Sequence, residues 1–296
     1  MPVIEIHALP DSRVLLGECP LWHPTEQALY WIDIAGHAVH RFDPSGCNHR
    51  SWPLSSEPGC IAWMADGGLV VAMRSGIAML NTDNGTVHFI CEPPYDASRI
   101  RFNDGRCDAA GRLWIGTLSD DRSKALGALY VLERGSIRKV GNPCTVSNGL
   151  AFSKDNRNLY HADTTAHRIS VYDFDLASSA LGGGQVFKQF TEVRGTNYQG
   201  RPDGASVDSE GAYWCAMYEG GKLLRLSSEG ALLQEVELPV RCPTMPAFGG
   251  ADYRTLYVTS VSSKRSEKEL KELPLSGCVL SLRVDVPGTP EYPYKP

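Results

Sequence analysis

Four polar residues with oxygen donors recur at one position of an internal pattern: Glu18, Asp104, Asn148 and Asp203. Three of them stand directly before glycine, in "NDGRCD", "SNGLAF" and "PDGASV", and Glu18 precedes "CPLW". Asp-Gly and Asn-Gly are common turn dipeptides, so each of the three could simply begin a strand with its side chain bonded to its own backbone. Glu18 is no turn former and still falls in register, which favours a shared ligand set.

Carboxylates that converge in a narrow channel repel one another unless a cation or a proton lies between them. We therefore expect one divalent cation. Oxygen ligands without Cys or His favour Ca²⁺, Mg²⁺ or Mn²⁺, and Zn²⁺ also accepts oxygen ligands. Three protein ligands would leave coordination positions open for water or substrate, as in catalytic sites. Asp104 has an alternative role as a turn residue, in which case its neighbour Asn103 faces the cavity.

A strand pattern repeats six times and must position these residues. Each repeat opens with a short apolar strand, followed by a turn rich in Asp, Gly, Pro or Asn and a second run of apolar, aromatic and β-branched residues. A third strand follows in every repeat and a fourth in five of them. The first strands start every 41 to 55 residues, at Glu18, Gly59, Asp104, Asn148, Asp203 and Thr244. This spacing predicts an all-β, six-bladed β-propeller whose first strands line a central channel.

The sixth repeat lacks a fourth strand, because only a tail rich in Pro, Gly and Tyr follows "GCVLSLRV". An unpaired edge in the last blade would be a liability. The N-terminal "VIEIHAL" (3–9) is predicted to fill it. First strand and last blade would then close the ring, and residues 1–296 would form a single domain.

Composition limits the class of partner. The chain has 296 residues, is 42% hydrophobic and carries a net charge of -5 without a basic block, which argues against nucleic acid. No secretory signal and no apolar run of membrane-spanning length is present, so we expect a cytoplasmic protein that does not enter a membrane. A closed ring leaves few free edges, which favours a monomer. The nine cysteines contain no C-x-x-C pair and are interpreted as buried thiols.

The chain resembles the family of regucalcin (senescence marker protein) and gluconolactonases over nearly its whole length. The segments "LLGECPLW", "RFNDGRCDAAGRLWIGT", "VSNGLAFSKDNRNLYHADT", "RPDGASVDSEGAYWCAMY" and "AFGGADYRTLYVTS" carry the resemblance, in the family's order and spacing. It implies a six-bladed propeller with one divalent cation held by Glu18, Asn148 and Asp203. It also implies that Arg101 and Asn103 hold substrate hydroxyls and that Asp203 doubles as the general base.

Two further positions follow from the same resemblance. An acid after "GTL" contacts sugar in the family, and Asp121 is the match here, with Asp120 as the alternative. The family has a small residue such as Gly or Ser where this chain has Cys19. Strand alternation should turn the Cys19 side chain away from the channel. If the thiol faced the metal instead, the site would favour softer cations, and oxidation of the thiol would inhibit the protein.

The resulting hypothesis is metal-dependent hydrolysis of a sugar lactone, an aldono-1,4- or 1,5-lactone such as gluconolactone, to the aldonic acid. An arylesterase or organophosphatase on the same scaffold is one alternative, and a calcium-binding propeller without catalysis is another. We expect segments 117–127 and 193–202 to cover the channel mouth, with Asp121 and Tyr198 shaping specificity. The insertion 261–277 is predicted to form a short, charged surface helix without a chemical role.

Overall fold

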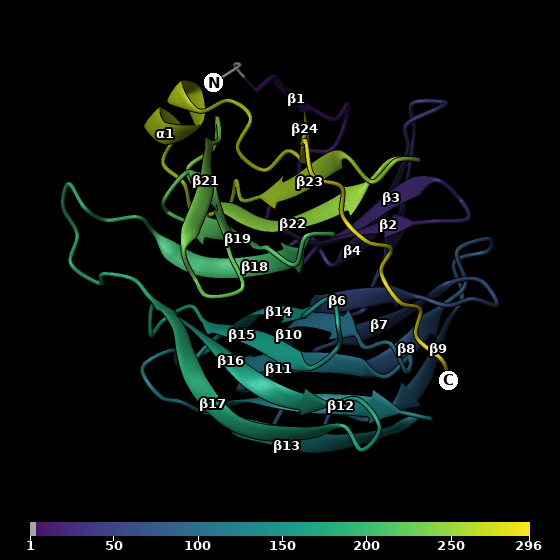
Figure 1. Ribbon diagram of the computed structural model, residues 1–296. Coiled ribbons are helices and arrows are strands. Elements are labelled where there is room, and N and C mark those ends of the chain that lie inside the picture. The colour runs from purple at the N-terminus through teal and green to yellow at the C-terminus, as the bar shows by residue number, and fades with distance from the viewer. Residues whose placement is uncertain (1–3) are drawn as a thin grey trace.

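The computed structural model describes residues 4–296, apart from the side chain of Asn142. Within these residues, six four-stranded antiparallel sheets surround a central channel as the blades of a propeller (Figure 1). Each blade holds four strands, and the first of each blade lies innermost. The six-bladed prediction is therefore confirmed.

The blades follow one another in chain order. The strands are, blade by blade, β2 (Gly17–His23), β3 (Ala28–Asp33), β4 (Ala38–Asp43) and β5 (Asn48–Pro53); β6 (Pro58–Trp63), β7 (Leu69–Met73), β8 (Gly76–Leu80) and β9 (Val87–Cys91); β10 (Ile100–Cys107), β11 (Leu113–Ser119), β12 (Gly127–Glu133) and β13 (Ser136–Cys144); β14 (Ser147–Phe152), β15 (Asn158–Asp163), β16 (Arg168–Asp175) and β17 (Ala180–Gln189); β18 (Arg201–Val207), β19 (Tyr213–Tyr218), β20 (Lys222–Leu226) and β21 (Leu232–Glu237); β22 (Pro243–Gly249), β23 (Thr255–Ser260), β24 (Leu280–Arg283) and β1 (Ile6–Ala8).

The last blade combines both ends of the chain. Its strand order is β1-β24-β23-β22, and β1 pairs antiparallel with β24 through Ile6 with Leu282 and Ala8 with Leu280. The N-terminal strand thus supplies the missing edge, as predicted from residues 3–9, of which Val3 lies outside the described residues. This pairing joins the first blade to the sixth without a covalent bond.

Every innermost strand pair carries a register shift near the start of its first strand. The shifts fall between Glu18 and Leu21, Pro58 and Cys60, Phe102 and Gly105, Asn148 and Ala151, Pro202 and Ala205, and Pro243 and Pro246. A bulge sets an extra residue against its partner strand and re-aims the side chains beside it. The repeated bulge therefore sits at the ring of polar positions that the sequence pattern singled out.

Buried tryptophans tie the first two strands of two blades together. Trp114 and Trp214 are fully buried, and each donates its indole N–H at 2.9 Å to an aspartate at the end of the first strand, Asp108 and Asp208 respectively. A buried indole fills large volume and needs a partner for its N–H, which these carboxylates provide. These bonds fix the first strands of the two blades at their C-terminal ends.

Arg106 links three blades at the end where the first strands finish. Its guanidinium donates to the carbonyls of Leu150 at 2.8 Å and Ala205 at 2.7 Å, so it links β10 to β14 and β18. It also pairs with Glu291 of the C-terminal tail. The tail is held there by the indole N–H of Trp63, which donates to the Glu291 carbonyl at 3.0 Å.

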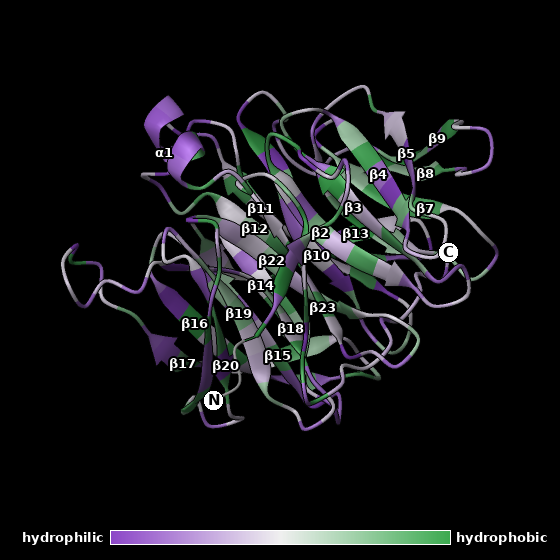
Figure 2. Cartoon of the chain, turned by 90° about the horizontal axis from the view of Figure 1, so that it is seen from above, coloured by the Kyte–Doolittle hydropathy of each residue, from purple (hydrophilic) through white to green (hydrophobic). Residues whose placement is uncertain are grey.

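The insertion between β23 and β24 contains the short helix α1 (Glu267–Glu272), capped by Ser266 and without a buried residue. It lies at the periphery and is hydrophilic (Figure 2), which confirms the predicted surface helix. None of the described helices has the length and apolar character that a membrane crossing requires.

Candidate active site

A small cavity opens at the end of the channel where the first strands begin. It has a volume of about 190 Å³, below the ~300–1,000 Å³ typical of pockets for drug-sized ligands. Five residues with predicted roles line it together: Glu18, Arg101, Asn103, Asn148 and Asp203. They come from blades one, three, four and five, so the fold brings together residues far apart in sequence.

Glu18 and Asp203 place two carboxyl groups in this buried space. Their exposed fractions are 7% and 6%. The Glu18 carboxylate accepts the Cys19 N–H at 2.9 Å, whereas the Asp203 carboxylate accepts no hydrogen bond from the described residues. Burial, followed by Asp203 and Asp104, raises the pKa of Glu18 well above its usual value. Burial and then Asp104 raise the pKa of Asp203 to about 8.

The orientation of the Asn148 amide follows from its neighbours. The Thr164 hydroxyl donates its only proton to the Pro202 carbonyl at 2.8 Å. It must then accept from Asn148, whose Nδ2 lies 2.8 Å away. The amide oxygen therefore faces the other way, where it accepts from Asn103 Nδ2 at 2.7 Å. A carbonyl oxygen has two lone pairs, so Asn148 keeps one acceptor position.

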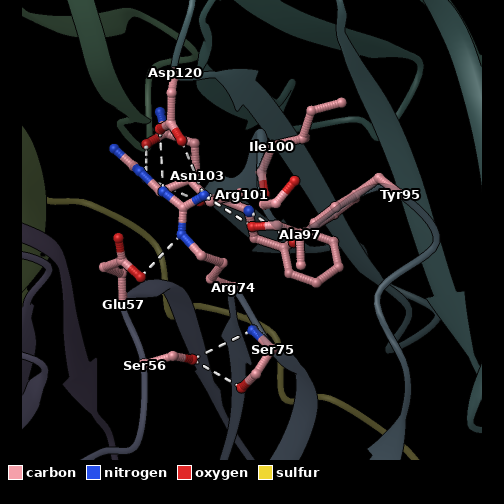
Figure 3. Close-up of polar contacts among 12 residues, drawn as sticks. Ser56, Glu57, Arg74, Ser75, Tyr95, Ala97, Ile100, Arg101, Asn103 and Asp120 are labelled. Atoms are coloured by element: carbon pink, nitrogen blue, oxygen red, sulfur yellow. Dashed lines mark hydrogen bonds and ion pairs between the residues drawn. The ribbon is translucent and has the colours of Figure 1, made fainter.

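Arg101 and Asn103 both line the cavity and contact each other (Figure 3). Arg101 Nη1 donates to Asn103 Oδ1 and to the Phe102 carbonyl, both at 2.8 Å. Asn103 Nδ2 also donates to the Ser147 carbonyl at 2.9 Å. Burial, then Arg122 and Arg74, lower the pKa of Arg101 to about 10, so the guanidinium stays charged at neutral pH. These contacts hold both side chains in one orientation before any ligand binds.

The donor set fits a divalent cation. Two carboxylates can balance a charge of +2, and an amide oxygen completes a set of hard ligands. A cation would also relieve the repulsion from neighbouring carboxylates that, after burial, raises the pKa values of Glu18 and Asp203. Residues 4–296 contain no cluster of three or more His, Cys, Asp or Glu side chains arranged to hold a metal. The candidate site therefore depends on the asparagine as its third ligand.

Two of the six ring positions contribute no side chain to the cavity, and one of them, Asp104, differs from the first sequence expectation. In β10 the bulge directs Asn103 into the cavity, whereas Asp104 does not line it. Asp104 instead accepts the Leu150 N–H at 2.9 Å, which agrees with its alternative role as a backbone-bonded residue. In blade two the position is Gly59, where a Cβ would lie 2.4 Å from the Phe102 carbonyl carbon. Only glycine fits there, so this blade contributes no side chain.

Asp121 and Asp120 both lie outside the cavity lining. Asp121 is exposed and accepts from the Ser123 N–H at 3.1 Å and hydroxyl at 2.6 Å within its own turn. Asp120 is paired with Arg74. The predicted sugar contact from this loop is thus not supported by the arrangement, and Arg122 lines the cavity instead.

The side chains of Cys19 and Tyr198 also lie outside the cavity lining. The Cys19 thiol is buried and packs against the Ile61 backbone, whose N–H donates to Sγ at 3.3 Å, as expected from strand alternation. Cys19 itself has a φ of 45°, a strained conformation for a residue with a Cβ. Tyr198 donates to Glu219 at 2.9 Å and does not line the cavity.

Several lining residues were not found from the sequence. They are Arg122, Thr164, Arg201, Tyr218, Ser263 and Lys264. The last two lie near the start of the insertion 261–277, to which no chemical role was assigned, and their place in the lining makes them candidates for contact with a ligand. Arg201 could have been identified from the sequence, because it stands two residues before Asp203 in the same strand. Charged loop residues such as Arg122 and Lys264 have no periodicity that would mark them.

Comparisons with known proteins agree with this architecture. The family model described as "SMP-30/Gluconolactonase/LRE-like region" matches residues 16–262. A 6-deoxy-6-sulfogluconolactonase from Pseudomonas putida is 45% identical over 278 residues, covering 94% of each chain. Regucalcin from Gallus gallus is 32% identical over 99% of each chain. The crystal structure of a calcium-binding regucalcin from Agrobacterium tumefaciens superimposes with a TM-score of 0.93 at 26% identity, covering 99% of this chain and 98% of that one.

The fold and the cavity define a six-bladed propeller with a buried acid and amide site at one end of its channel. The chain belongs to the SMP-30/gluconolactonase/LRE-like family, which confirms the resemblance seen in the sequence.

Proposed function

We propose that the chain is a sugar lactonase that hydrolyses an aldono-1,4- or 1,5-lactone to the open aldonic acid. One observation carries the proposal: Glu18, Asn148 and Asp203 meet in a small buried cavity beside the fixed donors of Arg101 and Asn103. The Pseudomonas putida relative is named for a lactone of a sulfonated sugar acid, which supports a sugar lactone as the substrate class.

In this reaction a water oxygen adds to the lactone carbonyl carbon, the ring C–O bond breaks, and the ring oxygen takes up a proton. Asp203 is proposed as the base that accepts the proton of the attacking water. Such proton transfer typically contributes ~10²–10⁴-fold to the rate. Arg201, Arg122 and Arg101 counteract the rise in its pKa and favour the ionised form that a base requires.

Arg101 and Asn103 are proposed to hold the hydroxyl groups of the sugar. Their mutual hydrogen bond leaves further guanidinium N–H groups for a ligand, because only Nη1 of Arg101 is bonded within the described residues. A polyhydroxylated ring needs donors at fixed points to be oriented for attack. Glu18, Asn148 and Asp203 would hold the divalent cation, which when bound polarises a carbonyl and stabilises the developing oxyanion.

A proton-release assay tests the proposal. Chelator-stripped protein is given glucono-1,5-lactone and other aldonolactones before and after Ca²⁺, Mn²⁺, Mg²⁺ or Zn²⁺ is restored, with Asp203→Asn alongside. We expect hydrolysis only with metal, and a loss of at least ~10² in kcat for the isosteric variant. Hydrolysis that is unaffected by either change would contradict the mechanism. Metal binding without turnover of any lactone would favour a non-catalytic calcium-binding role, and turnover of aryl or phosphate esters alone would favour the other alternative.

A further inference from the structure

The cavity is lined by more positive than negative side chains. Arg101, Arg122, Arg201 and Lys264 face it, against the carboxylates of Glu18 and Asp203. A divalent cation at the two carboxylates would neutralise them and leave the positive groups in excess. Arg201 is partly balanced, because it pairs with Glu219 at 3.2 Å. The other three form no ion pair with any described residue.

Arg101 is the most buried of these cations. Its exposed fraction is 7%, and its hydrogen bonds go to a backbone carbonyl and to an amide oxygen, both uncharged. A buried charge without a counter-charge is costly. Burial, then Arg122 and Arg74, lower its pKa, while Glu57 and Glu18 counteract this. The site is therefore poised for a ligand that brings negative charge.

Arg122 and Lys264 stand on opposite sides of the mouth. Arg122 belongs to the β11–β12 loop of blade three and Lys264 to the segment after β23 of blade six, and these blades face each other across a ring of six. Both residues are exposed, yet both line the cavity. Lys264 has a φ of 58°, an unusual conformation for lysine. Positive charge on both sides of a cleft attracts and orients an anionic ligand.

We propose that the preferred substrate is a lactone bearing an anionic substituent, such as a sulfonate, phosphate or carboxylate, which Arg122 and Lys264 bind at the mouth. The lactone ring then extends inward to Asp203, and the positive charge of Arg101 lies beside the bound molecule. This inference rests on the proposed lactonase function and specifies its substrate class.

Paired substrates test the preference. The kcat/KM is measured for 6-phosphoglucono-1,5-lactone, 6-deoxy-6-sulfoglucono-1,5-lactone and glucaro-1,4-lactone, each against the uncharged gluconolactone of the same ring size. We expect at least a tenfold preference for one or more anionic lactones. The ranking among the three identifies whether phosphate, sulfonate or carboxylate is the natural group. If no anionic lactone has a higher kcat/KM than its neutral partner, the proposal is overturned. Hydrolysis of the neutral lactones would in that case leave the lactonase function standing.

Charge variants locate the anion site. In Arg122→Gln and Lys264→Gln, the ratio of anionic to neutral kcat/KM should fall about tenfold each, and Arg122→Lys should recover part of the loss. Lys124→Gln and Lys268→Gln are matched controls, because Lys124 lies in the same loop and Lys268 on α1, and neither lines the cavity. These controls should leave the ratio unchanged. An equal fall in the control variants, or no fall in the test variants, would contradict the assignment.

A non-reactive ligand separates the two proposals. Sorbitol 6-phosphate contains the anionic group but no lactone, and its binding is measured by calorimetry against sorbitol. We expect binding that weakens with salt and in the Arg122→Gln, Lys264→Gln double variant. If no lactone is hydrolysed but this binding is seen, the lactonase function fails and the anion site stands. Binding no tighter than that of sorbitol would overturn the anion site independently of catalysis.

Discussion

Both carboxylate oxygens of Asp120 accept hydrogen bonds from Arg74, at 3.1 Å each. The same guanidinium donates to Glu57 at 2.9 Å and to the carbonyls of Ala97 at 3.1 Å and Ile100 at 3.4 Å (Figure 3). Arg74 follows β7 of blade two, so it fixes the segment that enters β10 of blade three. Ile100 immediately precedes Arg101 in the chain, which makes Arg74 a positioning residue for the cavity wall.

We predict that Arg74→Met weakens substrate binding without removing a group that touches substrate. Loss of the five contacts should let Arg101 shift, so that it no longer holds the substrate hydroxyls in place. Steady-state kinetics should therefore show KM raised about tenfold, with a smaller change in kcat. Arg41→Met is the matched control, because Arg41 pairs with Glu26 on the outer part of blade one at 3.0 Å. Equal kinetic effects in both variants would contradict the positioning role.

We predict that His161 makes the protein less stable in mild acid. Its ring is buried against the Ser147 hydroxyl, with 2.7 Å between Nε2 and Oγ, and burial lowers its pKa to about 4. Between pH 6.5 and 4 the unfolded chain binds a proton that the folded chain does not, so stability falls as the pH falls. From pH 7.5 to 5 this amounts to about 2 kcal/mol.

Chemical denaturation at the two pH values measures this loss. In His161→Gln the pH-dependent decrease in the free energy of unfolding should be smaller by that amount, because the variant has no group to titrate. His88→Gln removes an exposed histidine and should behave as the unchanged protein does. A His161→Gln variant with the full pH dependence would show that other groups cause it.

We predict that only one cysteine reacts rapidly with a thiol reagent in the folded protein. Cys47 is exposed and Cys91 partly exposed, while the remaining seven are buried. Burial raises the pKa of Cys19, which keeps it as the unreactive thiol. Mass spectrometry after brief labelling should find Cys47 modified, and Cys47→Ser should abolish the fast phase. Rapid labelling of Cys19 with loss of activity would instead support a thiol exposed to the metal site.

The repeats were predictable because strand alternation and turn residues recur at each blade, and the last blade's missing strand pointed directly to the N-terminus. The side chains at ring positions followed from the same register, including Glu18, Asn148 and Asp203. Whether Asp104 or Asn103 faces the cavity stayed open in the sequence, since a bulge shifts the facing residue by one position. Arg122 and Lys264 lie in irregular segments, where no period relates sequence to direction. Their contribution depends on how distant loops meet in space.

Arg106 and Glu291 pair at the end of the first strands opposite the cavity, where Arg106 also bonds the backbone of β14 and β18. For an enzyme of the proposed function, lactone and product would then enter and leave through the mouth that Arg122 and Lys264 line. Hydrolysis creates a carboxylate, so the departing molecule carries one more negative charge than the arriving one and leaves past cationic side chains. These cationic side chains would therefore hold the acid product more strongly than the lactone, and product inhibition that weakens with salt would be the signature.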